Sequence, residues 1–237
     1  MSLLLCALSA CDVSGVSGTS AGAAGSRSLQ ELERLAFVPA GSSRLEGYVG
    51  PYAECGVAVA LVVDRFEFTR GDWLHYDAAG ARSSAAAFTE ALGPRGSELF
   101  ALGDAERDLP AYLSFDEAQS LAQARGMRLP TPREWVYVAV GGRSLFYPYG
   151  GRQPQKSWAN TLELGLSAPT PVGTFESGRS RSFDCYDLLG NVWEWVDGAV
   201  LGYGDFPGLG AWDELEDDRL VSAMGGGFDS RSRRTVA

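Results

Sequence analysis

Residues 114–142 read SFDEAQSLAQARGMRLPTPREWVYVAVGG and carry the clearest structural signals in this chain of 237 residues. Ser114, with a glutamate three residues later, forms a capping box, and Gly126 is a typical C-terminal stop. Thr131 begins a second capping box, in which a proline takes the first helical position and Gly141 ends the helix. The stretch therefore predicts two helices with a short connection between them.

The segments upstream of this pair predict a mixture of strands and short helices. Residues 28–35 are an amphipathic helix candidate, and residues 37–52, punctuated by glycine and proline, predict a strand, a turn and a strand. Residues 57–68 are rich in β-branched and aromatic side chains, which is typical of one largely buried strand. Thr69 is expected to cap a further helix. Residues 78–103, rich in alanine, glycine and serine, are expected to form a loop.

The composition favours a loop-rich globular domain and excludes several classes of site. The 30 glycines, 11 prolines and 6 tryptophans point to many turns, and the residues after 142 are expected to form turns and short strands. The net charge of −10 argues against a nucleic-acid partner, because phosphate groups would be repelled. His75 is the only histidine, so zinc and iron sites that need several imidazoles are excluded. The 4 cysteines show no CxxC spacing, which excludes a zinc ribbon.

The N-terminus predicts export and a lipid anchor. Residues 1–10 (MSLLLCALSA) are apolar and end in small residues before Cys11, and the end of this stretch is similar to a bacterial lipobox. On this interpretation residues 1–11 are a lipoprotein signal peptide with Cys11 acylated, residues 12–28 are a flexible tether and residues 29–237 are the folded domain. The apolar run is short and no lysine or arginine precedes it. A start codon placed too late would explain both features, and the alternative is a cytosolic chain with an apolar start.

Export has consequences for the remaining cysteines and for the location. Cys55 and Cys185 would be left as an even pair in an oxidising compartment, which suggests one disulfide. The sequence alone leaves open whether the two residues lie close enough to pair. No stretch approaches about 20 consecutive apolar residues, so a membrane-spanning helix is not expected. The predicted location is the bacterial cell envelope, lipid-anchored and either periplasmic or surface-facing.

Beyond the two helices, several short motifs occur in the order found in one protein family. Arg128–Trp135 and Tyr186–Trp195 carry the closest matches, and the others are DRFEFT (64–69), YPYG (147–150), ANT (159–161) and PVGTF (171–175). Together these blocks resemble the formylglycine-generating enzyme, or sulfatase-modifying factor, family. The resemblance implies an α+β domain with the C-type lectin-like fold, in its loop-rich formylglycine-generating form.

The resemblance also implies calcium in the loop that contains GNVWEW (190–195). Its ligands here would be the side chains of Asp187 and Glu194 and the main-chain carbonyls of Gly190 and Val192. Calcium prefers several oxygen ligands, and a turn with a carboxylate at each end supplies them. The alternative is that both carboxylates only cap turns, while the tryptophans of the loop pack in the core.

A second calcium site of the family begins at Asn160 and the carbonyl of Thr161. The following loop, residues 162–168, is short and offers only Glu163 as a further carboxylate, so an expected ligand is missing. The acidic run at residues 213–218 is interpreted as a solvated loop, because it lacks the glycine turn and the spacing of a calcium-binding loop.

The catalytic chemistry of the family depends on two cysteines that bind copper(I) and support the oxidation of a substrate cysteine by dioxygen. In the corresponding segment, MGGGFDSRSRRT (224–235), Ser230 and Thr235 stand where the cysteines belong. A hydroxyl group does not replace a thiolate as a ligand of copper(I), so copper binding and formylglycine generation are not expected. The family also continues to a closing strand that is not found before Ala237, and its absence would leave an unpaired sheet edge.

These observations lead to an exported lipoprotein with a degenerate formylglycine-generating-enzyme-like domain, used as a non-catalytic binding or scaffolding module. Its partners would be the membrane, through the lipid anchor, and a protein, peptide or glycan ligand. One alternative is an enzyme of the same family with cysteine-independent chemistry, in which Trp193, Asp229, Ser230 and Arg231 line the groove. The other alternative is a truncated remnant without a function.

Overall fold

The computed structural model describes residues 5–7, 10–12, 29–44, 54–141, 147–150, 155–198, 211–214 and 220–231. Within these ranges the strands form a four-stranded sheet, a three-stranded sheet and a hairpin. The four-stranded sheet has the order β1 (Leu5–Ala7), β7 (Trp193–Val196), β9 (Leu220–Met224), β8 (Ala211–Glu214). The three-stranded sheet has the order β2 (Ala10–Asp12), β6 (Leu61–Asp64), β3 (Leu35–Val38), and the hairpin pairs β4 (Gly41–Arg44) with β5 (Glu54–Val57).

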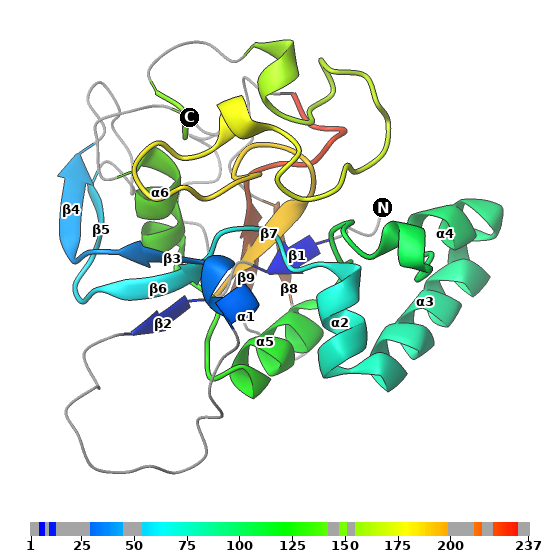
Figure 1. Cartoon of the computed structure of the whole chain (residues 1–237). Coiled ribbons are helices and arrows are strands. Elements are labelled where there is room, and N and C mark those ends of the chain that lie inside the picture. The colour runs from blue at the N-terminus through cyan, green and yellow to red at the C-terminus, as the bar shows by residue number, and fades with distance from the viewer. Residues whose placement is uncertain are drawn as a thin grey trace.

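Helices cover the sheets from several sides. They are α1 (Leu29–Glu33), α2 (Arg70–Tyr76), α3 (Ala78–Leu92), α4 (Pro94–Leu99), α5 (Phe115–Ala124) and α6 (Pro132–Val140), with short 3-10 turns at Asp104–Glu106, Lys156–Trp158 and Glu176–Gly178. In Figure 1, α2, α3 and α4 lie on one side of the four-stranded sheet, while α6 and the β4–β5 hairpin lie on the other. This mixture of helices and strands agrees with the predicted α+β class.

The two helices predicted from their capping boxes are confirmed. In α5, Ser114 Oγ accepts a hydrogen bond from the Glu117 amide at 3.3 Å, and in α6 Thr131 Oγ1 accepts one from the Glu134 amide at 3.3 Å. Gly141 ends α6 in the left-handed conformation, with φ of 68°. A third capping box, at Thr69, begins α2 as predicted. Local hydrogen bonds of this kind satisfy donors that a helix start leaves unpaired, so they define the boundaries.

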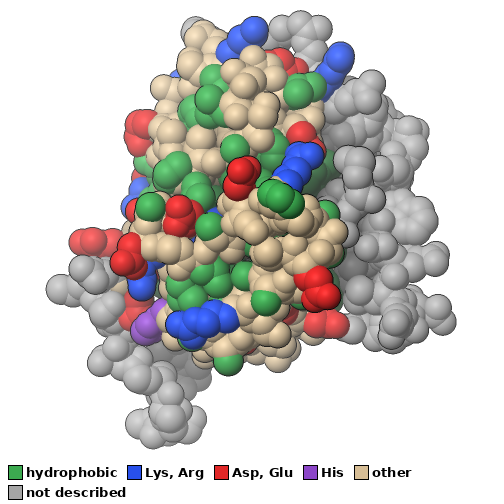
Figure 2. All heavy atoms as spheres, turned by 90° about the vertical axis from the view of Figure 1, so that its right-hand side faces the viewer, with side chains coloured by type: hydrophobic (Ala, Val, Ile, Leu, Met, Phe, Trp, Pro, Cys, Tyr) green, Lys and Arg blue, Asp and Glu red, His purple; other side chains and the backbone are tan. Residues whose placement is uncertain are grey.

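The prediction of a loop at residues 78–103 is wrong, because this segment forms α3 and α4. Asp77 caps α3 by accepting a hydrogen bond from the Gly80 amide at 2.9 Å. Alanine has the highest intrinsic helix propensity, which outweighs the scattered glycines and serines of this segment. Phe88 and Phe100 stack at 4.1 Å between ring centroids, which holds the helical hairpin to the domain. On the face that carries these helices, apolar, acidic and basic side chains are interspersed (Figure 2).

The single strand predicted at residues 57–68 is also wrong in its bounds. β5 ends at Val57 and pairs with β4, whereas β6 begins at Leu61 and pairs with β3, so the chain changes sheets between them. After β6 the chain runs to Glu67, which is buried. A long run of β-branched residues therefore serves two short strands.

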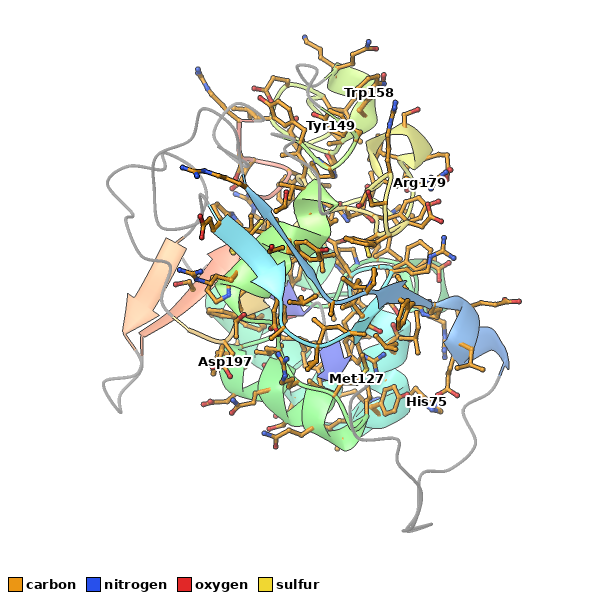
Figure 3. All side chains as sticks on the ribbon, turned by 90° about the vertical axis from the view of Figure 1, so that its left-hand side faces the viewer. His75, Met127, Tyr149, Trp158, Arg179 and Asp197 are labelled. Atoms are coloured by element: carbon orange, nitrogen blue, oxygen red, sulfur yellow. The ribbon has the colours of Figure 1, made fainter. Side chains whose placement is uncertain are left out.

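The core consists of apolar clusters on both sides of β7 and β9. One cluster joins α6 to β3, β5 and β6, and a second joins α2 and α5 to β7. Trp135 and Trp195 are buried in these two clusters, respectively. A smaller aromatic cluster contains Tyr149 and Trp158, whose rings meet edge to face at 4.8 Å. Figure 3 shows it at the end of the molecule opposite to His75.

The N-terminal segment predicted to be a signal peptide contributes two of the strands. β1 contains Cys6 and runs parallel to β7, and β2 contains Cys11 and runs antiparallel to β6. The predicted tether lies outside the described residues, except for its first residue, Asp12, which ends β2. No helix in the described part of the chain is long and apolar enough to cross a membrane.

Candidate functional site

The loop that precedes β7 is a tight coil. Asp187, Gly190 and Asn191 adopt positive φ values of 57°, 85° and 60°, in a region that side chains rarely occupy. Gly190 is required here, because a side chain at this position would collide with the main-chain oxygen of Asn160. The coil brings both predicted carboxylate ligands of calcium, Asp187 and Glu194, into the interior, where they are 8% and 0% exposed.

Asn191 is the centre of the hydrogen-bond network around this coil. Its side chain donates to Glu67 Oε2 at 2.6 Å and accepts from Asn160 Nδ2 at 3.1 Å and from the Thr170 amide at 2.9 Å. Its main-chain N–H donates to Asn160 O at 2.7 Å, and its carbonyl accepts from the Phe228 amide at 2.8 Å. One buried residue thus connects four segments that are distant in the sequence.

Three buried carboxylates surround the coil. Burial raises the pKa of Glu67 well above its usual range, and the charges of Asp187 and Glu194 add to the rise. Burial raises the pKa of Glu194 to about 8, against the hydrogen bond from Trp135 Nε1 at 2.8 Å, and the charge of Asp187 adds to it. Burial raises the pKa of Asp187 to about 6, although the Gly173 amide donates to it at 2.6 Å. These shifts show that the interior disfavours the ionised form of all three side chains.

Two unpaired oxygens fit the two predicted calcium sites, one in each ligand set. Glu194 Oε1 and Asn160 Oδ1 are buried and have no hydrogen-bond partner among the residues that the structure describes. Hard oxygen donors left unpaired in the interior suit a hard cation, which would replace the missing partners. Within the described ranges no three His, Cys, Asp or Glu side chains converge as a metal centre. A calcium ion at Asp187 and Glu194 would therefore also need main-chain carbonyls, as expected for Gly190 and Val192.

The second predicted calcium set is adjacent to the first. Asn160 Nδ2 donates to Ala168 O at 2.9 Å as well as to Asn191, which fixes the loop between them. Thr161 is buried and follows in the same turn, while Glu163 is only half-buried. The structure thus brings Asn160 and the GNVWEW coil into direct contact.

Sequence reasoning missed Glu67 and Asn191 as parts of the site. Glu67 lies in the DRFEFT motif, and its Oε1 accepts a hydrogen bond from the Val192 amide at 3.1 Å. The signal was available, since glutamate is out of place at the end of a buried strand unless a partner satisfies it. Its side-chain partner Asn191, however, lies 124 residues away in the sequence.

The predicted groove residues gather around Gly227. A side chain at Gly227 would lie 3.1 Å from Asp229 Oδ1 and 3.4 Å from Trp193 Cδ1. Ser230 Oγ accepts a hydrogen bond from the Gly227 amide at 3.0 Å, so it closes a turn within this segment. Arg231 is exposed at its end, and Thr235 lies outside the described residues.

The expected disulfide between Cys55 and Cys185 is not formed. Both residues are free thiols in the same apolar cluster, and each donates a hydrogen bond to a main-chain carbonyl. Burial raises the pKa of Cys55 to about 11 and also raises that of Cys185. Both side chains are packed within the apolar core.

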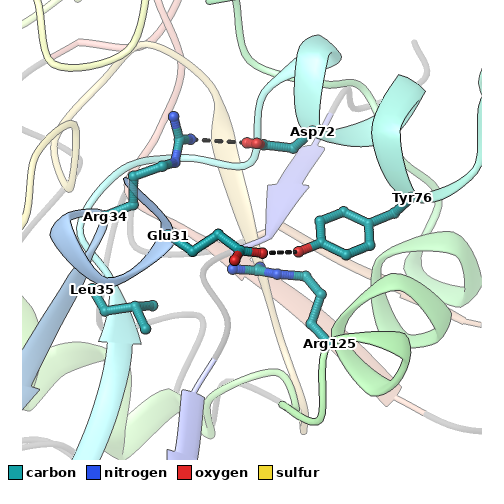
Figure 4. A pocket seen from close by; sticks show the side chains of 6 residues that line it. All are labelled: Glu31, Arg34, Leu35, Asp72, Tyr76 and Arg125. Carbon is teal, nitrogen blue, oxygen red and sulfur yellow. Dashed lines mark hydrogen bonds and ion pairs between the residues drawn. The ribbon is translucent and has the colours of Figure 1, made fainter. Parts of the chain in front are cut away.

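A pocket on another face of the domain is closed by ion pairs. It offers about 400 Å³ of space, partly open to solvent, between α1, α2 and α5 (Figure 4). Arg34 binds Asp72 at 2.8 Å across it, and Tyr76 donates to Glu31 at 3.2 Å. Arg125 binds Asp64 with two hydrogen bonds, at 2.8 and 2.6 Å. The charged groups around this pocket therefore pair with other groups of the protein, and these pairs hold α1 against the domain.

Several known proteins are similar to part of this chain. The chain is 36% identical over 100 residues to the inactive C-alpha-formylglycine-generating enzyme 2 of Mus musculus, covering 38% of this chain and 32% of that protein. It is 35% identical over 101 residues to hercynine oxygenase of Mycolicibacterium smegmatis, covering 40% and 23%. It is 34% identical over 96 residues to the formylglycine-generating enzyme of Mycobacterium tuberculosis, covering 35% and 31%.

These matches are partial, but the family match covers most of the chain. The matched part spans about a third or less of the length of each of these relatives. The family model described as a sulfatase-modifying factor enzyme 1-like domain matches residues 21–234. The chain therefore belongs to the sulfatase-modifying factor enzyme 1-like domain family.

Proposed function

We propose that this chain is a non-catalytic member of its family, which acts as a binding or scaffolding module for a protein, peptide or glycan. The observation that carries the proposal is the state of Ser230. Its hydroxyl stands where the family places a copper-binding thiolate, and it is already engaged by the Gly227 amide at 3.0 Å. A neutral hydroxyl held in a turn offers copper(I) neither the charge nor the soft donor that it requires.

The buried thiols support the same proposal. A thiolate is the form that binds copper and reacts, and burial favours the thiol form. With a pKa raised to about 11, Cys55 stays protonated at neutral pH, and the pKa of Cys185 is raised as well. Neither cysteine therefore replaces the missing pair. A relative named as inactive is among the similar proteins, which is compatible with a family domain used without its chemistry.

The non-catalytic proposal is tested with copper(I) and a cysteine-containing substrate peptide. We expect the chain to bind no copper(I) in competition with a chelator, and to form no aldehyde on the peptide under air. The matched variant carries Ser230→Cys together with Thr235→Cys, and tight copper binding by this variant alone would confirm that the thiolates are what is missing. Aldehyde formation by the unmodified chain would refute the proposal.

We further propose that calcium holds the coil at residues 187–194 and that the domain has the C-type lectin-like form of the fold. Support comes from the buried carboxylates of Asp187 and Glu194 and from Glu194 Oε1, which no described residue pairs. Calcium supplies positive charge to such a coil, and the residues of the chain bind and orient it. Isothermal titration of the chelated protein is expected to show saturable calcium binding that Asp187→Asn weakens.

The third part of the proposal is a location at the cell envelope through acylation of Cys11. It rests on the apolar residues 1–10 and the small residues before the cysteine. Expression in a bacterial host should yield a membrane-associated protein whose mass corresponds to cleavage before Cys11 plus lipid. Cys11→Ser is the matched control and should leave the protein unacylated. A protein of uncut mass in the soluble fraction would contradict this part alone.

A further inference from the structure

One N-terminal segment covers the edges of two sheets at once. Leu5–Ala7 pairs in parallel with β7, in the register Leu5↔Trp193, Cys6↔Glu194 and Ala7↔Trp195. Ala10–Asp12 pairs antiparallel with β6, from Ala10↔Val63 to Asp12↔Leu61. Figure 1 shows β1 beside β7 and β2 beside β6. Residues of this segment therefore pair with one side of β7 and one side of β6.

The edges themselves are built without this segment. On its other side β7 pairs with β9, and β6 pairs with β3, so each keeps a neighbour when the segment is removed. Trp195 Nε1 donates to Leu113 O at 2.9 Å, and Val196 is fully buried. Leu61 and Val63 of β6 are fully buried as well. Because these edges are already ordered, the entropic cost of binding a strand comes mainly from ordering the strand that binds.

An open edge of this kind is a template for strand addition. It presents a row of unpaired N–H and C=O groups, which an extended peptide satisfies with main-chain hydrogen bonds. The occupant seen here has the sequence LCA on β7 and carries no charge. Glu194 lies in the middle of the β7 edge and is fully buried, so an acidic residue paired with it would add repulsion.

We propose that the edge of β7 forms a strand-acceptor site for an extended, uncharged, apolar peptide. In the chain described here, residues 5–7 fill the site in cis. Cleavage before Cys11, which is part of the proposed function, removes β1 and opens the β7 edge to an equivalent strand from a partner protein. The cleavage that makes Cys11 the N-terminal residue thus also exposes the edge of β7.

The cis contact is tested first in the full chain by hydrogen exchange. Cys6→Pro fixes φ at about −65° in the middle of β1, which disfavours the extended backbone that pairs with β7. We expect the amides of Trp193–Val196 to exchange about tenfold faster in this variant, which corresponds to about 1.4 kcal/mol of lost protection. Ser17→Pro, in the predicted tether, is the matched control and should leave these amides unchanged. Equal exchange in Cys6→Pro and the unmodified chain would overturn the assignment of β1 to this edge.

The acceptor site is tested with a chain that begins at Cys11 and a labelled peptide of residues 1–10. Saturable binding, together with restored protection of Trp193–Val196, supports the site, and the same peptide with Cys6→Asp should bind at least tenfold more weakly. Absence of binding overturns the proposal, as does a dimer of the shortened chain that the peptide fails to dissociate. If the shortened chain does not fold alone, refolding in the presence of the peptide supports the site and failure to refold refutes it. Neither readout depends on whether cells cut the chain, so failure of the export proposal is distinguishable.

Discussion

Glu194→Gln should stabilise the calcium-free protein at neutral pH and at the same time abolish its response to calcium. The side chain is fully buried, and its Oε1 has no hydrogen-bond partner in the described ranges. Without a cation, the interior holds this carboxyl next to the charge of Asp187. Glutamine keeps the shape and can still accept the hydrogen bond from Trp135, but it carries no charge. The substitution therefore removes the electrostatic cost and the ligand together.

The size of the effect follows from the pKa of Glu194, which burial and Asp187 raise from 4.5 to about 8. At pH 7 the folded protein retains a proton that the unfolded chain has released. Each unit of pH above the unfolded value costs about 1.4 kcal/mol until the folded pKa is reached. The penalty at pH 7 is therefore about 3 kcal/mol. Stability from this group is fully present below pH 4.5 and is lost as the pH rises toward 8.

Thermal unfolding in chelator and in calcium, at pH values from about 5 to about 8, measures both halves of the prediction. In chelator the melting temperature of the unmodified protein should fall as the pH rises, and Glu194→Gln should exceed it at pH 7 by roughly 5–10 °C. Calcium at a hundredfold excess over its Kd should stabilise the unmodified protein by about 2.7 kcal/mol. The gap between calcium and chelator should widen with pH, because calcium binds the ionised carboxylate.

Two outcomes would refute this reasoning. If Glu194→Gln is less stable than the unmodified protein in chelator at pH 7, the buried carboxylate is not a source of strain. If the variant keeps the full calcium shift, the ion binds elsewhere. Glu98→Gln, on the exposed surface of α4, is the matched control for the loss of one charge and should change neither quantity.

Three further buried or partly buried polar residues give predictions that unfolding and hydrogen-exchange experiments check. Asn191→Ala should lower the free energy of unfolding by about 3 kcal/mol in urea titrations, because it leaves buried groups such as Glu67 Oε2 unpaired. Asn191→Gly should recover about 1 kcal/mol of that loss, because glycine adopts the positive φ of this position without strain. Burial alone would raise the pKa of Glu134, but hydrogen bonds from Arg128 outweigh burial, so this pKa is lowered. The carboxylate therefore contributes about 1 kcal/mol to the free energy of unfolding above pH 4.5, and this contribution is lost as the pH falls below that value. Acid titration of Glu134→Gln should lack this loss of stability. Arg70 is buried and donates to three main-chain carbonyls, so Arg70→Met should cost about 3 kcal/mol and speed hydrogen exchange in α4, while unchanged exchange there would contradict the assignment.

The sequence predicted best those parts of the fold that local hydrogen bonds determine. The capping boxes at Ser114 and Thr131 occupy four consecutive residues each, so their partners can be read from the sequence directly. The α3–α4 hairpin was missed because its composition resembles a loop, whereas its stability depends on contacts such as Phe88 with Phe100. Alanine-rich segments are ambiguous in this way, since helix propensity is weak unless packing completes it.

The candidate site divides along the same line. Asp187 and Glu194 could be predicted as candidate ligands because the motif around them resembles that of a known family, and the structure buries both side chains. Glu67 could not, because its contacts with Asn191 and Val192 join residues 124 and 125 positions apart. The sequence left open whether Cys55 and Cys185 pair, because sequence does not show the distance between two cysteines; in the structure both are free thiols within one apolar cluster.

Because the acidic side chains are buried, a cation bound beside them would also change the stability of the fold. Glu67, Asp187 and Glu194 disfavour folding at neutral pH when no cation is nearby. Burial raises the pKa of each of them, and the charges of neighbouring carboxylates add to the rise for Glu67 and Glu194. Asn191, which Glu67 orients, also receives the Phe228 amide and so connects the coil to the groove segment that ends in Ser230. A cation that relieves the coil would therefore stabilise the groove through Asn191, without any reactive thiol. The proposed calcium site therefore predicts that hydrogen exchange of the Phe228 amide slows when calcium is added, and exchange that calcium leaves unchanged would contradict this connection.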